Sequence, residues 1–453
     1  MPAKSPRPVN TEWEGVFSGL VGLWLALALL KFGNPVILDQ QMEAPVGRDA
    51  VLLSPWPMSW GYLLCGLVFL VSLRFWRWRT SAPLTLIVLP LVWLGWQFLS
   101  AIQTVDASLT AASLKHFSAC VMAFYVGLLA FSRVRRLRSF WIGLLGGFVV
   151  VLLVGWRQHF GGFEETRRFF YSLPDWQTFP PEFLKKVSSD RIYSTLFYPN
   201  ALAGVIILLL PVVLVVLWQA SASLAARFAG LAVITVLSVG CLFWSGSKAG
   251  WLIVLVQAVG ALLFLPVARS IRALALVFLV SAGLAAFWLK NQVYFERGAT
   301  SVSARIDYWK AGWVTLKSEP WLGSGPGTFM IRFKATKNPA SEMTRLAHND
   351  FLQQGSDSGW IGMLSYFGWF AGALVSLYRK SCSIRLDVQH FCIWLGVFGI
   401  AIQSFVEFGL YIPALAWPTF FFLGWLLGRS ETPLLPEIKS TKERSSPSLP
   451  THL

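Results

Sequence analysis

Long uninterrupted apolar runs constrain this chain more than any other feature. About twelve of them have roughly the 18 to 20 residues that an α-helix needs to cross a bilayer core. Of the 453 residues, 55% are hydrophobic and only 13% are charged, whereas a soluble domain carries about 25% charged residues. A soluble globule and a disordered chain are therefore excluded. The predicted spans lie at 15–32, 57–73, 83–103, 112–131, 139–160, 198–217, 224–244, 248–266, 270–289, 357–378, 388–409 and 411–428.

The apolar runs are continuous rather than alternating, which favours helices over a β-barrel. We therefore predict an all-α integral membrane protein with about twelve transmembrane helices. The first run is long enough to span the bilayer and no small-residue cleavage site follows it, so we expect a retained helix rather than a cleaved signal peptide.

Lys and Arg residues gather in every second connection, and cytoplasmic loops carry such an excess. The pattern predicts that both termini are cytoplasmic and that most of the formal net charge of +16 reflects membrane topology. The basic residues on this side are Lys4, Arg7, Arg74, Arg77, Arg79, Arg133, Arg135, Arg136, Arg138, Arg227, Arg269, Arg272, Arg379, Lys380, Arg385, Arg429, Lys439, Lys442 and Arg444.

Two long connections lie on the opposite side, where polar chemistry has room, and loops of this length usually serve a function. We expect each of them to carry short helices. The tail is rich in Ser, Pro, Lys and Glu, which predicts disorder. The chain then divides into N-terminal membrane helices (1–160), a first long loop (161–197), central membrane helices (198–289), a second, catalytic loop (290–356), C-terminal membrane helices (357–428) and a cytoplasmic tail (429–453).

The five cysteines fall in spans or on the side predicted to be cytoplasmic. Their spacing indicates neither a disulfide framework nor a metal site. We expect no cofactor and no metal. The basic clusters lie beside spans and carry no nucleic-acid-binding motif, so nucleic acid is not an expected partner.

The second long loop holds three features of interest. Residues 301–317 have the spacing of an amphipathic helix, with Ile306, Trp309, Trp313 and Leu316 on its apolar face and Arg305 beside it; the simpler interpretation is a surface helix with a solvated Arg305. The glycines at 323–327 could aim N–H groups at a phosphate, but no Gly-Lys-Ser/Thr follows, so a tight turn is favoured.

His348 is the only histidine deep in a long loop, close to a predicted membrane entry. A histidine titrates near neutral pH and can act as a base, an acid or a partner of phosphate. A single exposed histidine is more often inert. We therefore interpret His348 as a candidate catalytic residue whose role depends on its neighbours.

Four polar residues stand out against apolar surroundings. Arg191 and Asn200 flank the start of the sixth span, Lys248 lies between two spans, and Glu407 lies near the end of the eleventh. An ionisable group at membrane depth is costly and is a functional candidate by default. The alternatives are that Lys248 extends to the lipid headgroups and that Glu407 forms a structural pair with an arginine.

These residues occur in an order that resembles the O-antigen ligase and polymerase superfamily of bacterial envelope glycan assembly. The motifs are Arg191 to Asn200, Trp244-Ser-Gly-Ser-Lys248, Ser303-Ala-Arg305 with Trp309, Pro320-Trp-Leu-Gly-Ser-Gly325, and His348-Asn349-Asp350-Phe-Leu-Gln353 followed by Gly359. The similarity covers roughly 190–410 by motif. Where Lys248 stands, the family commonly has arginine, which binds with a planar fork that lysine lacks.

The resemblance implies a glycosyltransferase with a GT-C-like fold in the bacterial inner membrane, with its active site on the periplasmic side. It would move a glycan from undecaprenyl diphosphate to lipid A core or another saccharide, without metal or nucleotide. Fixed cations would stabilise the diphosphate leaving group. This assigns catalysis to His348, Arg305 and Glu407, and diphosphate binding to Arg191, Lys248, Arg305, Asn200 and Asn349.

Within that assignment, His348 is either the base for the acceptor hydroxyl or an imidazolium that binds phosphate. Direct displacement would invert the anomeric centre. The alternatives are a polymerase of the same family, a transporter or flippase of lipid-linked sugars, and a non-catalytic scaffold. A transporter would show broken helices with polar groups near the midplane, whereas the unusual residues here gather on one side.

Overall fold

The structure is a computed structural model that describes residues 11–41, 43–78, 80, 82–179, 184, 187–221, 223–264, 267–296, 300–339, 341–383 and 387–429. Within these ranges the chain forms helices and no strands. The long helices are α1 (Thr11–Lys31), α3 (Met58–Ser72), α4 (Leu84–Ser100), α5 (Ala107–Tyr125), α6 (Arg138–Arg157), α9 (Pro199–Ala220), α10 (Leu224–Ser245), α11 (Lys248–Phe264), α12 (Arg269–Glu296), α13 (Thr300–Ser318), α15 (Asp350–Ser383), α16 (Val388–Gln403) and α17 (Pro413–Arg429).

Short helical segments fill the connections. They are α2 (Arg48–Leu53), α7 (Phe163–Tyr171) and α14 (Phe329–Thr336), the 3-10 turns Val36–Gln41, Leu73–Phe75, Ala101–Gln103, Phe131–Arg133, Trp176–Thr178 and Gly409–Tyr411, and the π-turns Val126–Ala130 and Gln158–Gly162. As expected, both long connections carry short helices.

The all-helical architecture predicted from the apolar runs is confirmed, since each predicted span overlaps a helix, and it is consistent with an integral membrane protein. Nine helical segments in the described part are long and apolar enough to cross a membrane, while α11 and α16 are apolar but shorter. The count of twelve crossings stays a prediction. Several predicted boundaries differ from the structure. The helix α5 begins at Ala107, α12 continues to Glu296, α15 already begins at Asp350, and α16 ends at Gln403, so that Glu407 lies after the helix rather than near its end.

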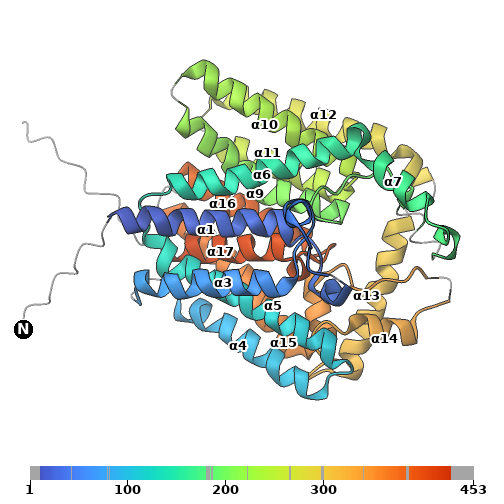
Figure 1. The fold of residues 1–453 in the computed structure, drawn as a ribbon. Helices are drawn as coiled ribbons and strands as arrows, with labels where there is room; N and C mark the ends of the chain where they lie inside the picture. The colour runs from blue at the N-terminus through green and yellow to red at the C-terminus, as the bar shows by residue number, and fades with distance from the viewer. Residues whose placement is uncertain are drawn as a thin grey trace, which may run out of the picture.

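The core of the bundle forms around α17, whose residues 413–428 are all buried. It packs against α5, α1 and the π-turn at 126–130, and in Figure 1 it runs through the middle of the bundle beside α1. Stacked aromatic pairs fix its register, with Trp417 against Trp24 (5.8 Å between ring centroids) and Phe420 against Trp369 (4.5 Å). Such offset pairs add stability beyond the area they bury.

The helices α7, α13 and α14 gather at one end of the bundle, shown on the right in Figure 1, whereas α10, α11 and α12 lie along one side. The most apolar 18-residue stretch of α12 has no buried residue, although that of α9 is 72% buried. An apolar helix that is exposed in this way is suited to contact with lipid.

The predicted disordered tail lies outside the described residues, as does the side chain of Cys382. Cys65, Cys120, Cys241 and Cys392 are buried and free, in agreement with a chain without a disulfide framework.

Candidate active site

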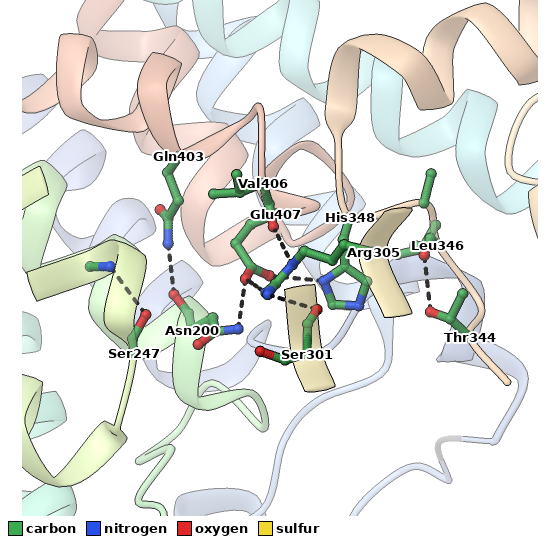
Figure 2. Close-up of polar contacts among 12 residues, drawn as sticks. Asn200, Ser247, Ser301, Arg305, Thr344, Leu346, His348, Gln403, Val406 and Glu407 are labelled. Atoms are coloured by element: carbon green, nitrogen blue, oxygen red, sulfur yellow. Dashed lines mark hydrogen bonds and ion pairs between the residues drawn. The ribbon is translucent and has the colours of Figure 1, made fainter. Parts of the chain in front are cut away.

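Four segments that are far apart in the sequence meet at the end of the bundle where α13 lies. They are the turn between α16 and α17, the residues just before α15, the first part of α13 and the segment leading into α9. Figure 2 shows their side chains converging on Glu407, which lies at the centre of the group.

Glu407 accepts hydrogen bonds from three partners. Its Oε1 is ion-paired with the Arg305 guanidinium and accepts from Asn200 Nδ2 at 2.7 Å. Its Oε2 lies 3.1 Å from His348 Nδ1. Glu407 is only 5% exposed. A buried carboxylate must have hydrogen-bonding or charged partners such as these to remain charged.

The electrostatic balance favours the charged form of Glu407. Burial alone would raise the pKa of this carboxyl, but the neighbouring His348 and Arg305 more than offset it, so that the pKa lies below its ordinary value. A charged carboxylate only accepts hydrogen bonds. Nδ1 of His348 therefore carries the proton of that contact, and Nε2 is the nitrogen left to act as a base in a neutral ring.

His348 is held from several directions. Its backbone has φ of +50°, a left-handed conformation that is uncommon for a residue other than glycine. Phe408 packs edge-on against the imidazole, with 4.6 Å between ring centroids. The Trp309 indole donates to the His348 carbonyl at 3.3 Å, so α13 fixes the backbone that carries the imidazole.

Arg305 lies on the face of α13 that turns toward the protein. Its Nε donates to the Val406 carbonyl at 3.1 Å, in addition to the ion pair with Glu407. The predicted apolar face of α13 was wrong in part, because Ile306 and Trp313 are 42% and 43% exposed. Tyr308, Gly312, Thr315 and Leu316 are buried instead. Arg305 is three residues before Tyr308, which places it at the end of that buried face.

Arg191 and Asn200 form the other side of the group. Arg191 donates through Nε to the Ser245 carbonyl at 2.8 Å and through a terminal nitrogen to Asn200 Oδ1 at 3.0 Å. Burial lowers the pKa of Arg191, Glu407 raises it and Arg305 lowers it, with a net lowering. An arginine stays protonated despite such a shift. The Asn200 carbonyl accepts from Gln403 Nε2 at 2.9 Å.

Two predicted phosphate-binding residues have other contacts. The Lys248 ammonium lies over the Tyr294 ring, 3.7 Å from its centroid, and it lies near Arg191 and Arg305. Asn349 caps α15, since its Oδ1 accepts from the Leu352 N–H at 3.0 Å. The structure thus brings together Arg191, Asn200, Arg305, His348 and Glu407, with Lys248 beside them, whereas Asn349 faces the helix that it caps. The roles of all these residues stay predictions.

The glycine-rich segment 323–327 is a packed turn, as the sequence favoured. The N–H groups of Ser324, Gly325 and Gly327 donate to Ser356, to the Asp357 carbonyl and to the Asp357 carboxylate respectively. They are therefore not available for a phosphate. Gly359 has φ of +69° and kinks α15 against Pro320 and Trp321, where a Cβ atom would clash with their carbonyls.

Asp350 was missed by the sequence reasoning. It is fully buried, its N–H donates to the Ser404 carbonyl at 2.8 Å and its Oδ2 accepts from the Leu410 N–H at 3.1 Å. It thereby ties both ends of the Glu407 turn to the helix that follows His348. The rule that identified Glu407, an acidic group within an apolar region, would also have identified Asp350 if the span predicted at 357–378 had been predicted to begin at Asp350, where α15 begins.

Comparison with known proteins finds a family similarity over the part of the chain that carries several of these residues. Residues 233–367 match a family model described as O-antigen ligase. This match supports the similarity of the chain to the O-antigen ligase and polymerase superfamily. The matched range includes Lys248, Arg305 and His348, and it ends before Glu407. A comparison with curated proteins found no match. The family supports ligase-type or polymerase-type glycosyl transfer in a membrane-integral protein, acting on lipid-linked and acceptor saccharides.

Proposed function

We propose that the protein is a glycosyltransferase of the periplasmic face, which moves a glycan from undecaprenyl diphosphate to lipid A core or another saccharide. The reaction is of the ligase type, independent of metal, and inverts the anomeric centre. The observation that carries this proposal is the shared carboxylate of Glu407, which contacts His348 through one oxygen and Arg305 through the other. A base and a phosphate-binding cation are thereby held side by side.

In this mechanism His348 is the general base. Nε2 takes the proton of the acceptor hydroxyl while that oxygen attacks the anomeric carbon, and the bond from this carbon to the phosphate oxygen breaks. Undecaprenyl diphosphate leaves with the electron pair. Glu407 holds Nδ1 (3.1 Å) and stabilises the imidazolium that forms, as the carboxylate of a histidine-based triad does.

The cations act on the leaving group. Negative charge builds up on the diphosphate as the glycan leaves, and fixed cations stabilise such charge most strongly in a site that excludes water. Arg305 and Lys248 approach from α13 and α11, and Arg191 from the segment before α9. Arg191 keeps donor capacity because only Nε and one terminal nitrogen are used in the contacts above.

The direction of the site follows from the basic residues. Arg74 and Arg133 lie in connections, and Arg227 and Arg272 lie in the first turns of α10 and α12. These positions alternate along the chain with the long connections, one of which carries Arg305 and His348. Because basic loops are cytoplasmic, the site would face the periplasm, where lipid-linked glycans meet their acceptors.

The test is to incubate the purified chain with a diphosphate-linked glycan lipid and candidate acceptors, followed by mass analysis and assignment of the product anomer. We expect one inverted linkage, abolished by His348→Ala and Arg305→Ala in proteins that still insert and purify normally. His159→Ala is the matched control, since His159 is an exposed histidine after α6. Full transfer by His348→Ala would refute the role of the base.

Product length separates this proposal from its rivals. Extended chains formed from donor alone would indicate a polymerase, whereas movement of the donor across vesicles without any product would indicate a flippase. Silent substitutions at both His348 and Arg305 would indicate a scaffold.

A further inference from the structure

A narrow cleft opens beside the Glu407 group, between the end of α10, the start of α11 and α12. Its enclosed space is about the size of one water molecule, and it opens to solvent at its mouth. Two lysines from different helices line it, Lys248 from α11 and Lys290 from α12, together with Gly246, Ser247 and Asn291. Leu242, Trp251, Ala286 and Phe287 complete the lining, so the cleft is a cationic opening with both polar and apolar walls.

The cleft belongs to a larger cluster of positive charge. Lys290 lies near Lys248 and Arg191, and Lys248 lies near Arg191 and Arg305. One carboxylate, Glu407, is ion-paired with this set, through Arg305. Across the described ranges neither lysine takes part in an ion pair. Cations that repel one another favour the binding of an anion between them.

Lys290 has a structural contact, but this contact does not explain why Lys248 lines the same cleft. Its ammonium donates to the Phe243 carbonyl near the end of α10 and lies over the Phe243 ring. A lysine at a helix C-terminus stabilises the last carbonyls, and this use leaves two of its three N–H donors. Capping α10 also requires no second lysine across the cleft, yet Lys248 lines it from α11.

We propose that Lys248 and Lys290 form a separate phosphate subsite, which binds the phosphate bonded to the lipid, while Arg191 and Arg305 bind the phosphate bonded to the glycan. This inference rests on the proposed function for the identity of the donor. It divides the diphosphate between two pairs of cations and adds Lys290 to the residues that bind it.

The lipid side is assigned from the position of Lys290. It lies six residues from the end of α12, the helix whose apolar stretch contains no buried residue, and Trp288 beside it is 58% exposed. A polyprenyl chain in the bilayer can therefore run along α12 and still present its phosphate to the lysines. Arg305 and His348 lie farther toward α13, where the glycan and acceptor would meet.

The charges also match. A diphosphate linked at both ends carries about two negative charges and gains about one more when the glycan leaves. The two lysines and two arginines carry four positive charges, and the negative charge of Glu407 reduces their sum to three. Three positive charges match the charge of the leaving group better than that of the intact substrate. A site that complements the departing group in this way accelerates the chemical step rather than only binding the donor.

The experiment measures binding of undecaprenyl monophosphate and of inorganic phosphate to the full chain in detergent. The wild type should bind the lipid phosphate more tightly than inorganic phosphate. Lys290→Met should weaken binding of the lipid phosphate by about tenfold to a hundredfold, because one charge-assisted hydrogen bond is lost. Lys290→Arg should restore it. Lys310→Gln, which removes an exposed lysine of α13, is the matched control and should have no effect.

Binding by Lys290→Met within twofold of the wild type would overturn the inference, as would equal affinity for inorganic phosphate. Should Lys290→Met fail to fold because α10 loses its cap, acetylation of the wild type gives the same answer. Undecaprenyl monophosphate should protect Lys248 and Lys290 but not Lys310, and no protection of Lys290 would refute the subsite.

The two proposals fail separately. If lysine-dependent binding is found but no acceptor ever receives glycan, the proposed transfer is wrong and the subsite remains. If transfer occurs and Lys290→Met changes neither KM nor kcat, the subsite is wrong and the transfer remains.

Discussion

Replacing Glu407 with glutamine tests the centre of the proposed site. The substitution preserves size and one acceptor oxygen, but it removes the charge shared by Arg305 and His348 and places an amide N–H where a second acceptor stood. Removing one partner of a buried ion pair costs about 3 to 5 kcal/mol in free energy of unfolding. Because the Arg305 side chain is 20% exposed, we expect the lower end, about 3 kcal/mol.

The loss of activity should exceed the loss of stability. An amide cannot both fix Nδ1 of His348 and stabilise the imidazolium, so the contribution of the base, about a hundredfold to ten-thousandfold in kcat, should be lost. The assay is glycan transfer with kcat and KM determined separately, beside thermal unfolding in detergent. We expect a large fall in kcat and a smaller change in KM.

The matched control is Glu319→Gln. Glu319 is also ion-paired with an arginine, Arg332, but its side chain is 25% exposed, against 7% for Glu407. A partly exposed pair contributes less than a buried one, so this variant should lose less stability than Glu407→Gln and should keep near-normal transfer. A kcat of Glu407→Gln within tenfold of the wild type would refute the assignment of Glu407 as the partner of a catalytic base.

Three further outcomes are expected. Asp350→Ala should lower kcat because the Glu407 turn loses its bond at Leu410, whereas Asp350→Asn keeps an acceptor and should retain most activity; equal loss in both variants, by transfer assay, would contradict a positioning role. Lys248→Arg should be tolerated, because the charge is kept, and a severe loss of transfer would contradict the alignment of that motif with the family. The lowered pKa of Glu407 means that its contribution to stability is present above its ordinary pKa of 4.5 and is lost as the pH falls through the lowered value. Thermal unfolding of the wild type should show this acid-side loss, and an identical acid-side slope in Glu407→Gln would argue against it.

Much of the fold could be predicted from the sequence because bilayer helices are set by local composition. Each apolar run became a helix, and the glycines at 323–327 became a packed turn. The errors came where tertiary contacts decide. Ile306 and Trp313 have helical spacing, yet α13 turns Tyr308 and Leu316 inward because it packs on α15 and α14. Likewise, α15 begins at Asp350, where the backbone N–H donates to the Ser404 carbonyl and the carboxylate accepts from the Leu410 N–H.

The candidate site was predictable as a set of residues and not as an arrangement. Arg191, Lys248, Arg305, His348 and Glu407 each stood out as polar or ionisable residues in unusual surroundings. No local rule could join positions more than two hundred residues apart, such as Asn200 and Glu407, which are hydrogen-bonded at 2.7 Å. Lys290 was also missed, because a lysine near a helix end is ordinary until a second lysine is found across the cleft.

The contacts divide the site into two parts that meet at Glu407. The turn that carries Glu407 is bonded to the bundle through the Leu410 carbonyl, which lies 2.6 Å from His116 Nε2 on α5. The start of α17, which follows the turn, is bonded through the Ala414 N–H to the Phe32 carbonyl after α1 (3.1 Å).

The second part consists of Arg305 and His348, which belong to the long connection and are joined by the bond from the Trp309 indole to the His348 carbonyl. The ion pair of Arg305 with Glu407 and the contact of His348 Nδ1 with Glu407 therefore link the long connection to the bundle. A substitution within the connection, such as Trp309→Phe, removes only a bond inside the second part. It should therefore reduce transfer less than Glu407→Gln, which weakens both contacts that link the two parts. A greater loss of transfer in Trp309→Phe would contradict this division.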